Sequence, residues 1–418
     1  MRMRHPVALV VLAWATLLPS QGLAQFTQHG PKLVGTGAVG PALEGFAVAL
    51  SADGDTAIVG GVDDNDTAGA VWVWTRSGGV WMQQSPKLVG AAAVGGSRQG
   101  FSVALSADGN TAIVGGKDDD LEAGAVWIWT RNGGVWTQQS PKLVGAGAAG
   151  NAQQGRSVVL SADGNTAIVG GYQDDGGAGA VWVWTRNAGV WTQQSGKLVG
   201  AGAIGKAQQG RSVALSADGS TLVAGGYADD NNAGAAWVWT RSGDTWTQQT
   251  KMVASDAVAP AQQGTSVALS ADGNTVIVGG FADNSNTGAA WVWTRSEGLW
   301  TQQSKLIGSG AEGIAEQGFS VSLSADGNTA IVGGILDNSF AGAVWIWKRS
   351  AGVWTQRSNK VVGSGAEGAA QQGVSVSLST DGNTAIVGGY RDNNGLGAVW
   401  VFSADDDPGA LRRHAVRH

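Results

Sequence analysis

The chain has 418 residues, among them 68 glycines and 20 tryptophans but no cysteine. Charged residues make up only 14%, whereas disordered chains are rich in charge and poor in aromatic residues, so a packed core is expected. The net charge of −6 argues against nucleic-acid binding, which needs a basic surface. The missing cysteines exclude disulfides, thiolate nucleophiles and cysteine zinc sites. Residues 30–413 contain no histidine, the commonest acid–base catalyst.

Residues 1–24 have the pattern of a secretory signal peptide. Arg2 and Arg4 form the charged start, residues 7–18 are apolar, and Gly22-Leu23-Ala24 is a small-x-small cleavage site. An apolar run of about 12 residues is too short for a membrane-spanning helix, so an uncleaved anchor is the lesser alternative. No later segment is continuously apolar for long enough to span. The sequence therefore predicts a secreted protein, periplasmic or extracellular, with no transmembrane segment after cleavage.

The rest of the chain is an internal repeat. The string L-S-[AT]-D-G recurs at intervals of 54 or 55 residues, with its aspartate at Asp53, Asp108, Asp163, Asp218, Asp272, Asp326 and Asp381. Such a period is typical of repeat architectures.

Each repeat contains four strand-like runs separated by turn residues. In the second repeat they are Ser102–Ser106, Thr111–Val114, Ala125–Thr130 and Val135–Val144. We call them strands A to D and name the loops by the strands they join. Helical periodicity is absent throughout, so the fold class is all-β, and repeats of this kind predict a seven-bladed β-propeller.

The ends of the chain predict how the ring closes. The last repeat stops after its third strand, and residues 26–35 match the fourth strand of the other repeats. We therefore expect the N-terminal segment to complete the last blade and pair an edge that would otherwise be open. The predicted domain spans residues 25–403, followed by a flexible tail over residues 404–418.

Tryptophans recur at three positions of most repeats, as at Trp127, Trp129 and Trp136. Their occurrence in every blade favours a core between blades, and a carbohydrate-binding platform is the alternative. Trp127 and Trp129 share a strand face, and a short turn is expected to place Trp136 opposite Trp129.

The B–C and D–A loops share one face of the ring, and every B–C loop carries an aspartate. The seven candidates for ion or ligand binding are Asp64, Asp119, Asp174, Asp229, Asp283, Asp337 and Asp392. Because carboxylates suit hard cations, this ring either gathers Ca²⁺ or a cationic partner, or simply makes turns and keeps the protein soluble. The aspartates of the short A–B turns are expected to cap their own turns.

The D–A loops differ from blade to blade, which makes this face the best place for a selective partner. The varying residues are Glu44, Arg98, Lys206, Asp256, Glu312 and Glu367.

The segments Gly100-Phe101-Ser102-Val103, residues 105–110 and Ile113-Val114-Gly115-Gly116 resemble the FG-GAP repeat. That repeat forms the seven-bladed propeller of integrin alpha chains and of many bacterial surface proteins. The A–B turn is too short for the family's calcium loop, so the resemblance does not imply calcium there. The leading Phe is replaced at Arg156, Arg211, Thr265 and Val374. The Gly-Gly pair followed by aromatics also resembles kelch repeats, a weaker alternative with the same architecture.

These features predict a non-catalytic, monomeric propeller that acts in adhesion or recognition of a protein or glycan, with no cofactor apart from the calcium alternative. A carboxylate-based extracellular hydrolase or lyase and a lectin-like sugar binder are the alternatives. Catalytic carboxylates need different environments, whereas the carboxylates here repeat around the ring.

Overall fold

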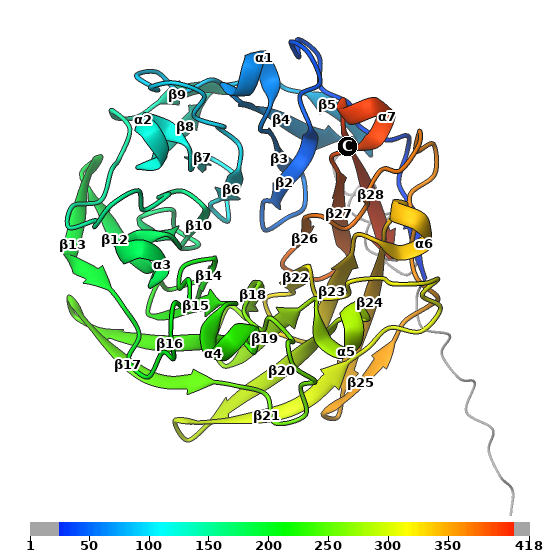
Figure 1. The fold of residues 1–418 in the computed structure, drawn as a ribbon. Helices are drawn as coiled ribbons and strands as arrows, with labels where there is room; N and C mark the ends of the chain where they lie inside the picture. The colour runs from blue at the N-terminus through cyan, green and yellow to red at the C-terminus, as the bar shows by residue number, and fades with distance from the viewer. Residues whose placement is uncertain (1–24, 405–418) are drawn as a thin grey trace, which may run out of the picture.

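A computed structural model describes residues 25–404. The predicted signal peptide and residues 405–418 of the predicted tail lie outside the described residues. Seven four-stranded antiparallel sheets form a closed ring of blades (Figure 1). The seven-bladed propeller predicted from the repeat is therefore confirmed.

In each blade the strands follow one another from the centre outward. The inner strands are β2 (Glu44–Leu50), β6 (Ser102–Leu105), β10 (Ser157–Leu160), β14 (Ser212–Leu215), β18 (Ser266–Leu269), β22 (Ser320–Leu323) and β26 (Val376–Leu378). The second strands are β3 (Thr56–Gly61), β7 (Thr111–Gly116), β11 (Thr166–Gly171), β15 (Thr221–Gly226), β19 (Thr275–Gly280), β23 (Thr329–Gly334) and β27 (Thr384–Gly389).

The third strands are β4 (Ala70–Ser77), β8 (Ala125–Asn132), β12 (Ala180–Asn187), β16 (Ala235–Ser242), β20 (Ala289–Ser296), β24 (Ala343–Ser350) and β28 (Ala398–Ala404). The outer strands are β5 (Val80–Gln83), β9 (Val135–Gln138), β13 (Val190–Leu198), β17 (Thr245–Met252), β21 (Leu299–Leu306), β25 (Val353–Gln356) and, for blade seven, β1 (Phe26–Gln28).

Blade seven joins the two ends of the described chain. Its sheet has the order β1-β28-β27-β26, with Phe26 opposite Ala404. Leu33 continues the pairing, since its N–H donates to the carbonyl of Val399 at 2.8 Å. The predicted closure by the N-terminal segment is confirmed.

Two predicted strand limits differ from the structure. The Gly115-Gly116 pair forms the last two residues of β7 instead of following the strand; a Cβ at Gly115 would come within 2.2 Å of the Gly155 carbonyl in the next blade. The outer strand predicted to reach Val144 ends at Gln138, and Leu143 rejoins the blade through a bridge to Val126. Pro141, which lacks an N–H, lies in the interruption.

The first tryptophan of each repeat forms part of the hydrophobic core between blades. Trp127 is fully buried and packs in one cluster with Ile58 and Val73 of blade one. Its indole N–H donates to the Ala91 carbonyl at 2.8 Å. The predicted pairing of Trp136 with Trp129 is wrong, because the register places Trp136 opposite Arg131, whose guanidinium lies 5.3 Å from the ring centroid.

The A–B turns form a second ring at the other face. Ala52 N–H donates to the Ala107 carbonyl at 2.9 Å, and the pattern continues through Ala162, Ala217, Ala271, Ala325 and Thr380, which returns to Ala52. Each turn is capped by its own aspartate, as predicted: Asp108 accepts from the Ser106 hydroxyl at 2.5 Å and from the Asn110 N–H at 2.9 Å. Burial would raise the pKa of Asp108, but these hydrogen bonds and the charge of Arg131 outweigh burial and lower it.

The B–C loops contain single turns, which surround one face of the ring in Figure 1. They are α1 (Asp64–Thr67), α2 (Asp119–Glu122), α3 (Asp174–Gly177), α4 (Asp229–Asn232), α5 (Asp283–Asn286), α6 (Asp337–Phe340) and α7 (Asp392–Gly395). Each contains left-handed residues, such as Asp120 with φ 50° and ψ 64°. Asp and Asn tolerate this conformation, which explains their abundance here. Within residues 25–404 no helix is long and apolar enough to cross a membrane.

Candidate functional site

The seven B–C aspartates are buried and lie against lysines. Asp64 is fully buried; its Oδ2 lies 2.5 Å from Lys87 Nζ, and its Oδ1 accepts the Val39 N–H at 2.7 Å. The same arrangement recurs in the pairs Asp119–Lys142, Asp174–Lys197, Asp229–Lys251, Asp283–Lys305, Asp337–Lys360 and Asp392–Lys32. Each pair therefore fastens a B–C loop to the outer strand of its own blade or to the segment directly after that strand.

These contacts bear directly on calcium binding. Lysine and a backbone N–H occupy the oxygens that a cation would need, and the lysines balance the charge of the predicted acidic ring. Within residues 25–404, no group of three or more potential ligand side chains is placed to hold a metal. The role of the seven aspartates as ion ligands stays a prediction, while their ion pairs give them a structural role.

The varying D–A residues take different positions. Arg98 lies 3.7 Å from Asp63 and 3.4 Å from Asp118, and the Asp256 carboxylate accepts the Trp291 indole N–H at 2.9 Å. The remaining ones are Glu312 and Glu367, which pair with Lys360 and Lys32, Lys206, which is exposed, and Glu44, which is buried.

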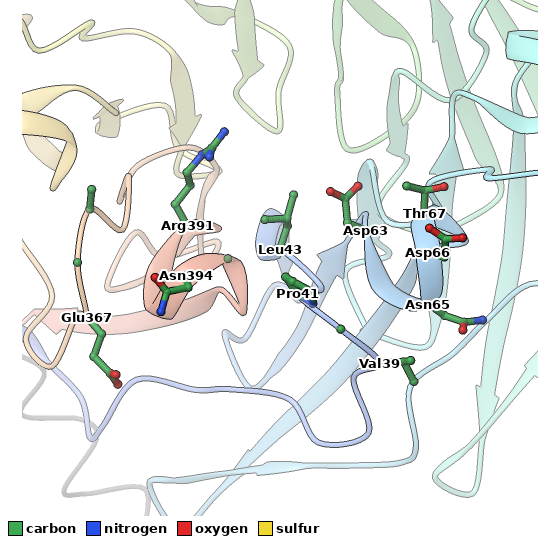
Figure 2. A pocket seen from close by; sticks show the side chains of 14 residues that line it. Val39, Pro41, Leu43, Asp63, Asn65, Asp66, Thr67, Glu367, Arg391 and Asn394 are labelled. Carbon is green, nitrogen blue, oxygen red and sulfur yellow. The ribbon is translucent and has the colours of Figure 1, made fainter.

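The face formed by the B–C and D–A loops is hollowed where blade one meets blade seven. This seam pocket has a volume of about 820 Å³ and is lined by Val39, Gly40, Pro41, Leu43, Asp63, Asn65, Asp66, Thr67, Glu367, Gly368, Ala369, Arg391, Asn394 and Gly395. Figure 2 shows Pro41 and Leu43 between Arg391 and Asn394 on one side and Asp63 and the α1 residues on the other. The pocket thus has apolar residues at its middle and both signs of charge on its walls.

The residue types at the seam differ from those at the junction between blades three and four. At the corresponding place between blades three and four, Lys206 covers the short α3 turn: a Cβ at Gly177 would lie 3.5 Å from Lys206 Cδ. At the seam the counterpart of Lys206 is Pro41, and a Cβ at Gly395 would lie 3.2 Å from Leu43 Cδ2 and 3.6 Å from Pro41 Cβ. Leu43 likewise replaces the arginine, glutamine or glutamate found in the other blades. The seam therefore presents compact apolar side chains where that junction presents a lysine.

A second cavity lies in the central channel, with a volume of about 310 Å³. Its lining comes from the inner strands of all seven blades and includes Phe46, Phe101, Arg156, Arg211, Thr265, Phe319 and Val374. These are the positions of the leading Phe of the repeat. Because the inner strands start at the B–C and D–A face, these residues form the end of the channel nearest that face.

The channel residues carry aromatic and cationic contacts. Arg156 Cζ lies 4.7 Å from the Phe101 ring centroid and 5.6 Å from that of Tyr172. Arg211 Cζ lies 5.4 Å from the Tyr227 centroid. Burial lowers the pKa of Arg211 to about 10, against an opposing effect of Tyr227, so the guanidinium remains charged at neutral pH.

Sequence reasoning singled out neither the seam pocket nor the arginines as a site. The arginines were visible only as departures from the repeat. In a chain whose blades are nearly identical, a position that varies freely is itself a signal, and the leading-Phe position holds Phe, Arg, Thr or Val. The seam needed the structure, because its walls are far apart in the chain.

Residues 246–293 match the FG-GAP repeat family. This segment of the protein is similar to an FG-GAP repeat. The matched segment runs from β17 of blade four to β20 of blade five, so one FG-GAP unit spans two blades. The kelch-like alternative is not needed to account for the blades.

Solved structures support the same propeller fold. Matches include a candidate 6-phosphogluconolactonase from Bacteroides uniformis ATCC 8492, with 14% identity, a TM-score of 0.55, and coverage of 76% of this chain and 85% of that one. At this identity the likeness concerns the fold alone. No curated protein matches the sequence.

Proposed function

We propose that this FG-GAP propeller is a non-catalytic adhesion or recognition module that binds a protein or glycan through the face formed by its B–C and D–A loops. The observation that carries the proposal is the seam pocket on this face, about 820 Å³ in volume, whose lining includes Leu43 where the other blades have arginine, glutamine or glutamate. A rigid ring that presents variable loops around a cavity is a common arrangement for binding.

The carboxylates support binding over catalysis. A hydrolase or lyase needs an acid and a base in different environments. The seven B–C aspartates instead share one environment, since each is buried beside a lysine, as Asp64 is beside Lys87. The enzyme alternative therefore lacks an asymmetric pair at these positions.

We also propose that the protein acts outside the cytoplasm as a monomer. The signal-like residues 1–24 and the FG-GAP repeats support export. The closed ring supports a monomer, because β1 covers the edge of β28 that would otherwise be free to pair with a second copy.

The test is a binding screen of the full chain against glycans and surface proteins, repeated with a variant that fills the seam pocket. Pro41→Lys places at the seam the residue type that covers the α3 turn from Lys206. Asp244→Asn, on an exposed C–D turn of the opposite face, is the control. We expect a partner that is bound by the wild type and the control and is lost in Pro41→Lys.

Absence of any partner, or binding that Pro41→Lys leaves unchanged, would contradict the proposal. To test for catalysis, any glycan that the protein binds is incubated with it and analysed for products. Turnover of that glycan would favour the hydrolase or lyase alternative.

A further inference from the structure

Positively charged side chains from neighbouring blades gather at the end of the channel. The leading-Phe position of each blade lies there, and in several blades the residue that follows the Gly-Gly pair contacts it. In blades two, three and four these positions bring Lys117, Arg156 and Arg211 to three consecutive blades. We call these three side chains the cationic arc.

The two arginines of the arc have aromatic contacts but no acidic partner. Within residues 25–404, no carboxylate oxygen lies within 4.0 Å of either guanidinium, whereas Lys117 pairs with Asp118. Lys117 and Arg156 also share one ring, at 5.0 Å and 4.7 Å from the Phe101 centroid. Placing like charges together costs free energy that a bound anion recovers.

Stacking prepares the arginines for such an anion. A guanidinium that lies over an aromatic ring is held in one orientation, and its N–H donors remain free at its edge. Those donors match the two oxygens of a carboxylate or phosphate group. The lowered pKa of Arg211 agrees with a cation that lacks a counter-ion.

The cavity sets the size of the ligand. At about 310 Å³ it lies at the lower end of the range for small-molecule sites and suits one sugar-sized ring. Phe46 and Tyr390, whose ring centroids are 5.5 Å apart, add aromatic surface to the same lining.

We infer that the channel end binds a sugar-sized ligand through a carboxylate or phosphate group held by Arg156 and Arg211. This inference rests on the proposed binding function and names the chemical class of one ligand. It assigns the arginines, which break the repeat, as specificity-determining residues.

The test is calorimetric titration of the full chain at low ionic strength with glucuronate, glucose 6-phosphate and glucose. We expect at least one anionic probe to bind and neutral glucose not to bind. Added salt weakens binding, because it screens the charges. Comparison of the two anionic probes tells whether the carboxylate or the phosphate is preferred.

Substitutions then locate the site. Arg156→Thr and Arg211→Thr introduce the residue that blade five already has at this position, Thr265. Each is expected to weaken binding at least tenfold, and the double variant abolishes it. Asp244→Asn, which changes an exposed charge on the opposite face, is the control and leaves binding unchanged. If the Thr variants do not fold, Arg211→Lys takes their place. It keeps the positive charge but loses the planar guanidinium, so we expect its affinity to lie between that of the wild type and no binding.

The inference is overturned if neither anionic probe binds at millimolar concentration, if glucose binds equally well, or if the double variant binds as the wild type does. Its failure is separable from that of the proposed function. If the binding screen finds a partner but neither anionic probe binds, the proposed function stands and the channel site is rejected. If an anionic probe binds but the screen finds no partner, the channel site stands and the proposed recognition function is rejected.

Discussion

At the scale of single residues, Glu44 stands where the other six blades have glutamine. In blade two, Gln99 Oε1 accepts the Gly90 N–H at 2.5 Å, and its Nε2 donates to the Gly90 carbonyl at 3.1 Å. Glu44 accepts the Gly35 N–H at 2.6 Å, but an ionised carboxylate has no hydrogen for the Gly35 carbonyl. Burial raises the pKa of Glu44 to about 7, in spite of the hydrogen bond from Gly35.

This pKa predicts that stability falls as the pH rises. The folded protein keeps a proton on Glu44 that the unfolded chain releases at a pH of about 4.3. Between that pH and about 7 the folded state therefore binds more protons, so the free energy of unfolding decreases with rising pH. We expect Glu44→Gln to remove this loss and to stabilise the protein above pH 7 by on the order of 3 kcal/mol.

Denaturant unfolding at several pH values from 5 to 8 measures the effect. Gln99→Glu is the matched control, because it places the same carboxyl in blade two and is expected to introduce the same pH dependence there. A Glu44→Gln variant that keeps the wild-type pH dependence would disprove the assignment.

The residues of the ion pairs show what could be read from the sequence. The aspartates stood out because Asp64 and its counterparts recur in every repeat. Their lysines recur as regularly, 22 or 23 residues later, yet only the fold shows that Lys87 turns back to Asp64. For blade seven the lysine is Lys32, at the other end of the chain from Asp392.

At the scale of elements, each B–C turn depends on its buried aspartate. We expect Asp119→Asn to destabilise the protein by about 3 kcal/mol, because it leaves the charge of Lys142 without its partner. Asp120→Asn is the control: Asp120 is exposed and left-handed, and asparagine tolerates that conformation well. Chemical denaturation compares the two variants, and equal losses of stability would contradict the role of the pair.

The same turns predict the response to calcium. Because the oxygens of Asp64 and its six counterparts are engaged, we expect millimolar calcium to leave the midpoint of thermal unfolding unchanged relative to EDTA. A midpoint that rises with calcium would show that the ion displaces the lysines or binds elsewhere in the native state.

Strand alternation was enough to predict every blade, because period-two patterns and glycine turns are local. The left-handed B–C turns were not predicted, since Asp-rich loops are compatible with many conformations. The Trp136 register was also missed. It depends on how many residues the C–D turn takes up, which the pattern of tryptophans does not specify.

At the scale of the whole molecule, the ring depends on its N-terminal closure. We expect deletion of residues 26–35 to lower the unfolding temperature and to promote association, because β28 then has a free edge and Asp392 loses Lys32. Attaching these residues after Ala404 through a four-residue turn is expected to restore both properties. Calorimetry and size-exclusion chromatography measure them, and a deletion variant as stable as the wild type would contradict this role.

The overlap between one FG-GAP unit and two blades has a consequence for how such chains grow. A unit supplies the outer strand of one blade and the first three strands of the next, as residues 246–293 do. Duplication or loss of a whole unit therefore leaves every blade with four strands and returns both termini to a shared blade. The closing segment itself therefore never has to change when the number of blades does.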